Sequence, residues 1–181
     1  MKKSHITKAM AAAFAASIAV GTAPAVYAAD GTAEPKVVYS FDFEDGDVSL
    51  FTNRGGKDTT EISASTEDSA SGEKALLASG RSDSWHGPAF RLDDKLEPYT
   101  EYYISAKIKG RYYTGAMMSF QYTVDGETKY QNLVQNLNGS DWLSVDRVKV
   151  SFTDEMEGVY VYFEGGTDDI FLDDFFIIFL R

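Results

Sequence analysis

The sequence predicts an all-β protein built as an antiparallel β-sandwich of the jelly-roll type. Apolar and polar residues alternate with a period of two along most of the chain, and the 3.6-residue period of helices is hard to find. Turn signals rich in glycine fall about one strand apart. About ten short strands with this punctuation are typical of a sandwich. An immunoglobulin-like sandwich is the structural rival, but its cysteine signature is missing because the chain has no cysteine.

The alternating segments justify individual strands in chain order. Half-buried strands are predicted at residues 37–43, 103–108, 116–124, 147–152 and 159–164. Turns are predicted between strands at residues 45–46, 54–56, 71–72, 87–88, 125–126, 138–139 and 165–166. The segment 171–180 is also strand-like, but it is apolar on both faces. Such a strand is either buried on both sides or exposed to aggregation.

The N-terminal residues have the pattern of a secretory signal peptide. Lys2, Lys3 and Lys8 make a basic start, an Ala-rich apolar run follows, and Ala28 ends a stretch suited to cleavage. The apolar run is too short to span a hydrocarbon core of ~30 Å. We therefore expect residues 1–28 to be a signal peptide, 29–36 a short lead and 37–181 the folded domain of a secreted, extracellular protein.

Composition excludes several kinds of partner and site. The formal net charge is -11, and signal cleavage would remove three lysines and no acid, which gives -14. A charge of this sign repels nucleic acid and anionic membranes. Without cysteine there is no disulfide or thiolate zinc site, and two histidines cannot form a three-histidine metal site.

Trp85 is the first candidate for function. It lies between small polar residues and the Gly87-Pro88 break, so its indole is a candidate for partial exposure. Exposed aromatic faces bind the C–H faces of sugar rings while hydroxyl groups stay hydrated. An equally weighted alternative is that Trp85 closes one end of the core. His86, without an identifiable catalytic partner, is interpreted as a structural residue.

A second candidate is a row of polar and aromatic residues on one strand. Val159, Val161 and Phe163 complete an apolar face, which leaves Tyr160, Tyr162 and Glu164 on the other face at spacings of roughly 7 Å. A polar face is also expected on residues 117–123, followed by Tyr130. Together these faces would form a concave groove for a glycan, whereas the alternative is an ordinary solvated sheet surface.

Carboxylates cluster near both ends of the predicted domain, at residues 42–47 and 168–174. First and last strands often meet in a sandwich, and converging carboxylates can hold Ca²⁺. The spacing does not match an EF-hand, and a charge run is usually a solvated loop. No motif selects a catalytic carboxylate pair, so an enzyme is the minority interpretation.

Several segments resemble the family 22 carbohydrate-binding modules, which are related to the family 4 and 9 modules. The specific segment is Gly80-Arg81 followed by Ser84-Trp85-His86-Gly87-Pro88. Other similar segments occur in the same order: Phe41-Asp-Phe-Glu44, Asn53-Arg54-Gly55, Ser71-Gly72-Glu-Lys-Ala-Leu76, Leu96-Glu-Pro98 to Ser105-Ala-Lys107, Tyr160-Val-Tyr162-Phe-Glu164 and Phe171-Leu-Asp-Asp174. The resemblance covers about residues 38–179.

This resemblance implies a non-catalytic module that binds β-1,4-xylan, or mixed-linkage β-glucan, for an associated xylanase. The carbohydrate-binding residues that it implies are Arg54, Trp85, Tyr130, Tyr162 and Glu164. Trp85 and a tyrosine would stack on successive sugar rings, and Arg54 and Glu164 would bind hydroxyl groups. It also implies a structural Ca²⁺ held by Glu44 and Asp174, with Asp42 behind them and backbone carbonyls near residues 72–74.

Two alternatives to this prediction stay open. The chain ends at Arg181 directly after the last predicted strand, so it is either a free-standing module or a fragment of a secreted endo-1,4-β-xylanase without its catalytic domain. A protein or cell-wall adhesion domain on the same fold is the other alternative. We expect a monomer, fused to or associated with a xylanase catalytic domain.

Overall fold

A computed structural model describes residues 34–55, 60–112, 115–136 and 141–181. The predicted signal peptide lies outside these residues. The strands, all antiparallel, are β1 (Pro35–Phe41), β2 (Phe51–Arg54), β3 (Glu61–Ser65), β4 (Ala75–Ser79), β5 (Gly87–Arg91), β6 (Tyr102–Gly110), β7 (Ala116–Val124), β8 (Glu127–Asn136), β9 (Leu143–Val150), β10 (Glu157–Glu164) and β11 (Ile170–Leu180). Within the described ranges, no helix is long and apolar enough to cross a membrane.

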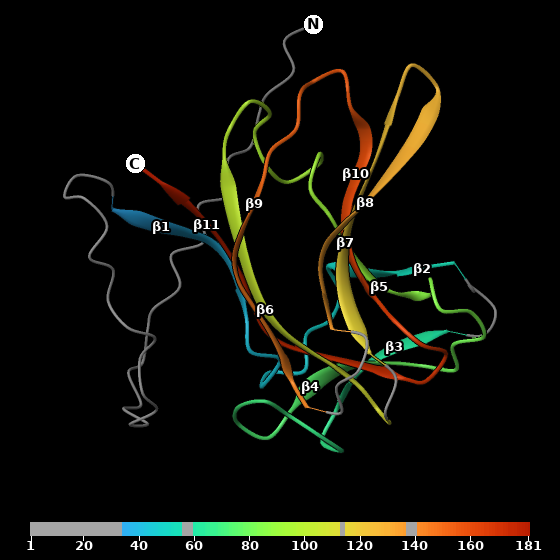
Figure 1. Cartoon of the computed structure of the whole chain (residues 1–181). Coiled ribbons are helices and arrows are strands. Elements are labelled where there is room, and N and C mark those ends of the chain that lie inside the picture. Colours follow the sequence, from blue (N-terminus) through green and yellow to red (C-terminus); the bar gives the residue numbers. More distant parts are fainter. Residues whose placement is uncertain (1–33, 56–59, 113–114, 137–140) are drawn as a thin grey trace, which may run out of the picture. The chain divides into compact units, whose positions relative to one another are not determined.

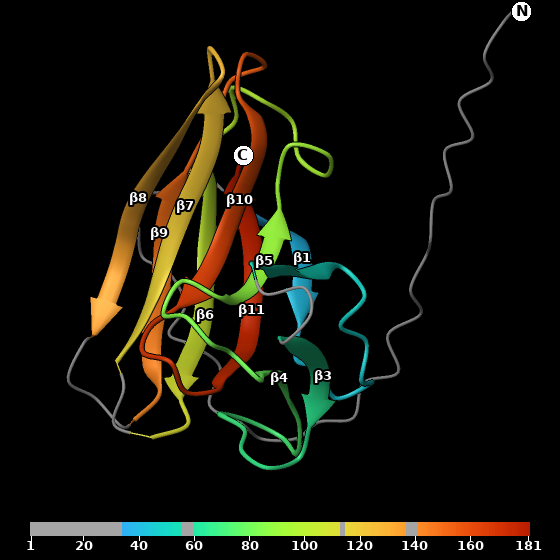
Figure 2. The same cartoon turned by 90° about the vertical axis from the view of Figure 1, so that its right-hand side faces the viewer.

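The strands form two sheets, which confirms the predicted sandwich (Figures 1 and 2). One sheet has the order β3-β4-β11-β6-β9, with β1 also paired to β11. The other has the order β2-β5-β10-β7-β8. Rings from both sheets meet in the core, where Phe90 of β5 and Phe163 of β10 lie 5.2 and 5.8 Å from Phe175 of β11. The first and last strands meet, as the sequence predicts.

A β-bulge in β11 decides which of its apolar residues enter the core. Asp173 pairs with Lys107 and Phe176 with Ser105, so three steps along β11 match two along β6. The extra residue reverses the alternation, and Asp174 there has a φ of 46°. Ile170 and Leu172 are therefore followed into the core by Phe175 and Ile177. Strict alternation would instead have placed Asp174 and Phe176 there.

The outer face of β11 is covered at one end. Phe171 is only 2% exposed, because Trp142 lies 6.4 Å from its ring and the Arg111 guanidinium lies 5.6 Å above it. Toward the C-terminus the cover is thinner, with Ile178 half-buried and Leu180 exposed. The strand is thus buried on both faces along its first part, which was one of the two outcomes expected from the sequence.

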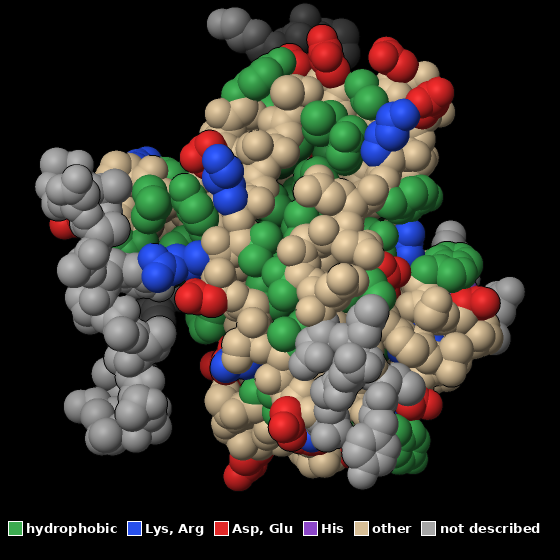
Figure 3. All heavy atoms as spheres, viewed as in Figure 1, with side chains coloured by type: hydrophobic (Ala, Val, Ile, Leu, Met, Phe, Trp, Pro, Cys, Tyr) green, Lys and Arg blue, Asp and Glu red, His purple; other side chains and the backbone are tan. Residues whose placement is uncertain are grey.

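Charged side chains are scattered over the face of the molecule that Figure 3 shows. On the face shown in Figure 3, Lys and Arg side chains lie among Asp and Glu and form no extended basic patch.

The bulge predicts a large difference between two adjacent phenylalanines. Phe175→Ala should lower the free energy of unfolding by about 3–5 kcal/mol, because it empties a site at the centre of the core. Phe176→Ala removes a half-buried ring from the outer face and should cost at most about 2 kcal/mol. Guanidinium denaturation of the two variants measures both values, and equal or reversed losses would contradict the register.

Candidate functional site

The outer face of the five-stranded sheet carries the predicted row of polar and aromatic residues. Val159, Val161 and Phe163 are buried in the core, so their neighbours along β10 point to the opposite face. The strand register extends this face to β7 and β8 through two cross-strand rows, Tyr160-Gln121-Tyr130 and Tyr162-Ser119-Asn132. Three strands therefore contribute side chains to one surface, which we call the outer-face site. The concave shape expected for this surface from the sequence stays a prediction.

Arg54, at the end of β2, lies among three aromatic rings of this site. Its guanidinium carbon is 3.7 Å from the ring centroid of Tyr162, 5.3 Å from that of Tyr130 and 5.4 Å from that of Trp85. Such distances favour cation–π attraction. The guanidinium therefore lies against Tyr162 and is flanked by two further rings.

Hydrogen bonds fix the orientation of the same guanidinium. Arg54 Nη1 donates to the backbone oxygen of Trp85 at 2.7 Å, and Nε donates to Gln121 Oε1 at 3.2 Å. Nη1 also lies 3.4 Å from Glu164 Oε2, where both side chains are largely buried. Arg54 thus connects β2, β7, β10 and the loop before β5.

The three rings differ in the surface that they offer. Trp85 is 47% exposed and Tyr130 is 61% exposed, whereas Tyr162 is only 2% exposed. The observed exposure of Trp85 decides between the two sequence interpretations in favour of a surface ring. Tyr162 supports Arg54 instead of offering a free face, so Trp85 and Tyr130 are the rings that can stack on a ligand.

Two glycines, Gly55 and Gly87, permit close packing around the Trp85 segment because they have no side chain. A Cβ on Gly55 would overlap the Trp85 ring and the His86 ring, and its φ is 67°. A Cβ on Gly87 would overlap the backbone oxygen of Phe163 in the adjacent strand. The Arg-Gly turn therefore fits against the Trp85 and His86 rings because Gly55 lacks a side chain, and β5 approaches β10 closely because Gly87 lacks one.

His86 lies behind the indole as a packing residue. It is only 4% exposed, and its ring meets that of Trp85 nearly at right angles, with centroids 4.3 Å apart. Its ring nitrogens lie near Ser82 Oγ at 3.4 Å and Asp83 Oδ2 at 3.5 Å. These contacts agree with the structural role inferred from the sequence.

Arg81 holds the loop that carries Trp85. Its buried guanidinium donates to five backbone oxygens in two loops, those of Ser84, His86, Gly165, Gly166 and Asp168. Burial lowers the pKa of Arg81 to about 10, although the charges of Asp169, Glu164 and Asp168 oppose this shift. Arg81 belongs to the family-like segment that begins at Gly80, but the sequence alone did not predict its role in holding this loop.

Glu164 is the buried acid of the outer-face site. Its Oε1 accepts a hydrogen bond from Ser119 Oγ at 2.8 Å, and the residue is 8% exposed. Burial raises the pKa of Glu164 above its ordinary value, while the Ser119 hydroxyl and the charges of Arg54 and Arg81 work in the other direction. Burial and the neighbouring Glu164 charge likewise raise the pKa of Tyr162.

The five predicted carbohydrate-binding residues all belong to this constellation, namely Arg54, Trp85, Tyr130, Tyr162 and Glu164. Gln121, Ser119 and Asn132 join them through hydrogen bonds. The sequence indicated that these three lie on polar strand faces, but a contact between strands needs the register to be known.

Hydrogen-bond donors and positive charges surround the acid of the outer-face site. Among the described residues, the Ser119 hydroxyl and the charges of Arg54 and Arg81 act on the Glu164 carboxylate. The arrangement is suited to binding hydroxyl groups and ring faces.

The predicted calcium ligands are only partly brought together. Glu44 and Asp174 both contact residues 71–74, but Asp42 Oδ1 accepts the backbone amide of Glu44 at 3.2 Å. Glu44 Oε1 and Asp174 Oδ1 already accept hydrogen bonds from this loop. Among the described residues, no three acidic or histidine side chains are close enough to hold a metal. Two of the three carboxylates thus reach one loop and are hydrogen-bonded there, and the calcium site stays a prediction.

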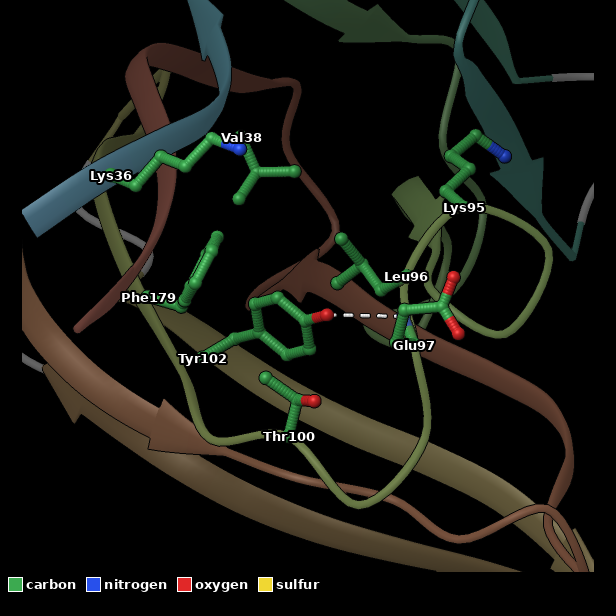
Figure 4. Close-up of a pocket in the computed structure, with 8 residues that line it drawn as sticks. All are labelled: Lys36, Val38, Lys95, Leu96, Glu97, Thr100, Tyr102 and Phe179. Atoms are coloured by element: carbon green, nitrogen blue, oxygen red, sulfur yellow. Dashed lines mark hydrogen bonds between the residues drawn. The ribbon is translucent and has the colours of Figure 1, made fainter. Parts of the chain in front are cut away.

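A separate cavity of about 380 Å³ lies between β1, the end of β11 and residues 95–102 (Figure 4). The hydroxyl of Tyr102 accepts the backbone amide of Glu97 at 3.0 Å, and the Lys36 ammonium is 5.6 Å from the Phe179 ring centroid. None of the predicted site residues lines this cavity.

Comparison with known proteins gives a family and a fold. A family model described as a carbohydrate binding domain matches residues 35–169. Among solved structures, the C-terminal family 22 carbohydrate binding module of Clostridium thermocellum Xyn10B is 22% identical, with a TM-score of 0.69 over 79% of this chain and 94% of that chain. The CBM22-1 xylan-binding domain of Paenibacillus barcinonensis Xyn10C is 23% identical, with a TM-score of 0.67 over 80% and 94%. The predicted fold and the family resemblance are confirmed.

The curated relatives are much longer proteins. The chain is 23% identical over 171 residues to endo-1,4-beta-xylanase C of Paenibacillus barcinonensis, and this match covers 91% of the chain but 14% of the relative. It is 27% identical over 153 residues to endo-1,4-beta-xylanase A of Thermoanaerobacterium saccharolyticum, covering 78% and 12%. The chain thus spans about an eighth of these relatives.

The raised pKa of Glu164 predicts a pH dependence of stability. Below the ordinary glutamate pKa of about 4.3 the group is protonated in both states, and its contribution to stability is complete. As pH rises through the higher folded-state pKa, this contribution is lost. The unfolding free energy of the wild type, relative to Glu164→Gln, should therefore fall as pH rises above about 4.

Guanidinium denaturation across this pH range measures the difference. Glu155→Gln changes an exposed carboxyl in the connection between β9 and β10, and it is the matched control. A wild-type value that rises with pH relative to Glu164→Gln would refute the assignment.

Proposed function

Because this chain belongs to the carbohydrate binding domain family, we propose that its outer-face site binds a neutral glycan, β-1,4-xylan, without cleaving it. The observation that carries the proposal is the placement of Arg54 between the two exposed rings of Trp85 and Tyr130. Exposed rings on both sides of a fixed hydrogen-bond donor match a sugar chain, which has apolar ring faces and polar edges.

Each group has a distinct part in the proposed binding. Trp85 and Tyr130 stack on sugar rings, and Tyr162 holds the Arg54 guanidinium from below. Arg54 and Glu164 bind hydroxyl groups through charge-assisted hydrogen bonds. Because these groups are held by neighbours before any ligand arrives, little ordering is required on binding.

The choice of xylan rests on the relatives. Solved modules of the same fold are named as xylan-binding domains, and one structure holds a family 22 module with a GH10 module and xylohexaose. The net charge of -11 is compatible with an uncharged backbone polymer and gives no attraction to an anionic one. Mixed-linkage β-glucan is the second polymer to test.

We further propose that the protein is secreted and acts with a xylanase catalytic domain. The N-terminal residues 1–28 have the composition of a signal peptide, and the curated relatives are endo-1,4-beta-xylanases. In this arrangement the module holds an associated hydrolase close to plant cell wall polysaccharide and raises its local concentration.

Affinity electrophoresis tests the binding proposal. Residues 29–181 should be retarded in gels that contain xylan, and Trp85→Ala should weaken binding by about 30-fold or more, as expected for a central aromatic anchor. Trp142→Ala is the matched control, because this tryptophan packs on Phe171 of the other sheet. Parallel gels with barley β-glucan and hydroxyethylcellulose define the preferred polymer.

The same experiment separates the alternatives. Equal losses in Trp85→Ala and Trp142→Ala would contradict a site centred on Trp85. Folded protein that no polymer retards would favour an adhesion domain, and release of reducing ends that Glu164→Ala abolishes would favour an enzyme.

A further inference from the structure

Three segments distant in sequence meet at the ends of the strands. They are the connection after β1, which contains Glu44, the loop before β4 at residues 70–74, and the bulge of β11 at Asp173 and Asp174. We call this meeting point the strand-end junction. It contains the residues that the family resemblance assigned to calcium, and hydrogen bonds show what its oxygen atoms contact.

The Glu44 carboxylate is bound to backbone amides. Its Oε1 accepts the amides of Glu73 and Lys74, each at 2.9 Å. A Cβ on Gly72 would overlap this carboxylate, so the glycine permits the close approach of the loop. Two amide donors thus bind one oxygen of this carboxylate and hold the loop against it.

The β11 carboxylates of the junction are also engaged. Asp173, fully buried, accepts the amides of Ala70 at 2.8 Å and Ser71 at 3.0 Å through Oδ2, and that of Asp174 at 2.7 Å through Oδ1. Asp174 Oδ1 accepts the hydroxyl of Ser71 at 2.9 Å. Four donors from the loop and the bulge thus bind these two carboxylates.

Lys74 supplies a positive charge from within the junction. Its Nζ donates to the backbone oxygen of Glu44 at 2.7 Å, while its own amide donates to the carboxylate of the same residue. The residue is half-buried, and its ammonium lies within hydrogen-bond distance of an oxygen of the kind that Ca²⁺ would take. A divalent ion bound to that oxygen would be repelled by the ammonium beside it.

We propose that the Lys74 ammonium takes the place of a divalent cation in the strand-end junction, so that the fold of this protein does not need calcium. The loop before β4 is held to Glu44 by one side chain and two amides, and to β11 by Asp173 and Asp174. A lysine is covalently part of the chain, and it therefore keeps this junction closed whatever the calcium concentration.

Thermal unfolding of the wild-type chain tests the proposal directly. Residues 29–181 are dialysed against EDTA and melted with EDTA or with excess CaCl₂. The two melting temperatures should agree within about 1 °C, whereas a cation at 100 times its dissociation constant would raise the value by roughly 5–10 °C. A calcium-dependent rise of that size would overturn the proposal.

Variants of Lys74 test the part played by the ammonium. Lys74→Met keeps the aliphatic stem and should lower the melting temperature by about 3–8 °C, and Lys74→Arg should recover most of the loss. Lys149→Met is the matched control, since this lysine forms an exposed ion pair with Glu101. A Lys74→Met melting temperature equal to that of the control would refute the role of the ammonium. If Lys74→Met does not fold, the wild-type melts still decide whether calcium is needed.

Discussion

The hydrogen bonds of the buried Arg81 guanidinium are the interaction on which the site depends. Five backbone oxygens from two loops converge on one side chain. A guanidinium has five N–H donors in a fixed plane, so it can satisfy several carbonyls that no strand pairing reaches. Even with its pKa lowered to about 10, Arg81 stays charged at neutral pH. Removal of this side chain would leave buried carbonyls unpaired and release both loops.

The position of the exposed rings of the outer-face site follows from this constraint. Arg81 fixes the loop that contains Trp85, and the backbone oxygen of Trp85 in turn accepts a hydrogen bond from Arg54. Arg54 then lies between Tyr162 and the exposed Tyr130. One arginine is thus structural and the other belongs to the proposed binding site, and the first positions the second through the backbone. These contacts hold the outer-face site in place without a ligand.

Stability and recognition are located in different parts of the sandwich. The strand-end junction joins Glu44, the loop before β4 and the bulge of β11, all in or beside the six-stranded sheet. The outer-face site lies on the five-stranded sheet, and the shared core separates the two. Changes at the junction therefore alter the melting temperature without directly touching the rings that face the ligand.

The sequence by itself determined the strand periodicity, and with it the sandwich and the face shared by Tyr160, Tyr162 and Glu164, because side chains alternate strictly along a strand. The resemblance in its Trp-His-Gly-Pro segment, its Arg-Gly turn, its Tyr-x-Glu strand and the other matching segments indicated the family and the five predicted binding residues. Only the tertiary structure decided that Phe175 enters the core, because a bulge at Asp174 reverses the alternation. It also decided that Tyr162 is buried beneath Arg54, and that Lys74 reaches the carbonyl oxygen of Glu44. The reason is that exposure and hydrogen-bond partners depend on which strands become neighbours, and local alternation carries no information about distant segments.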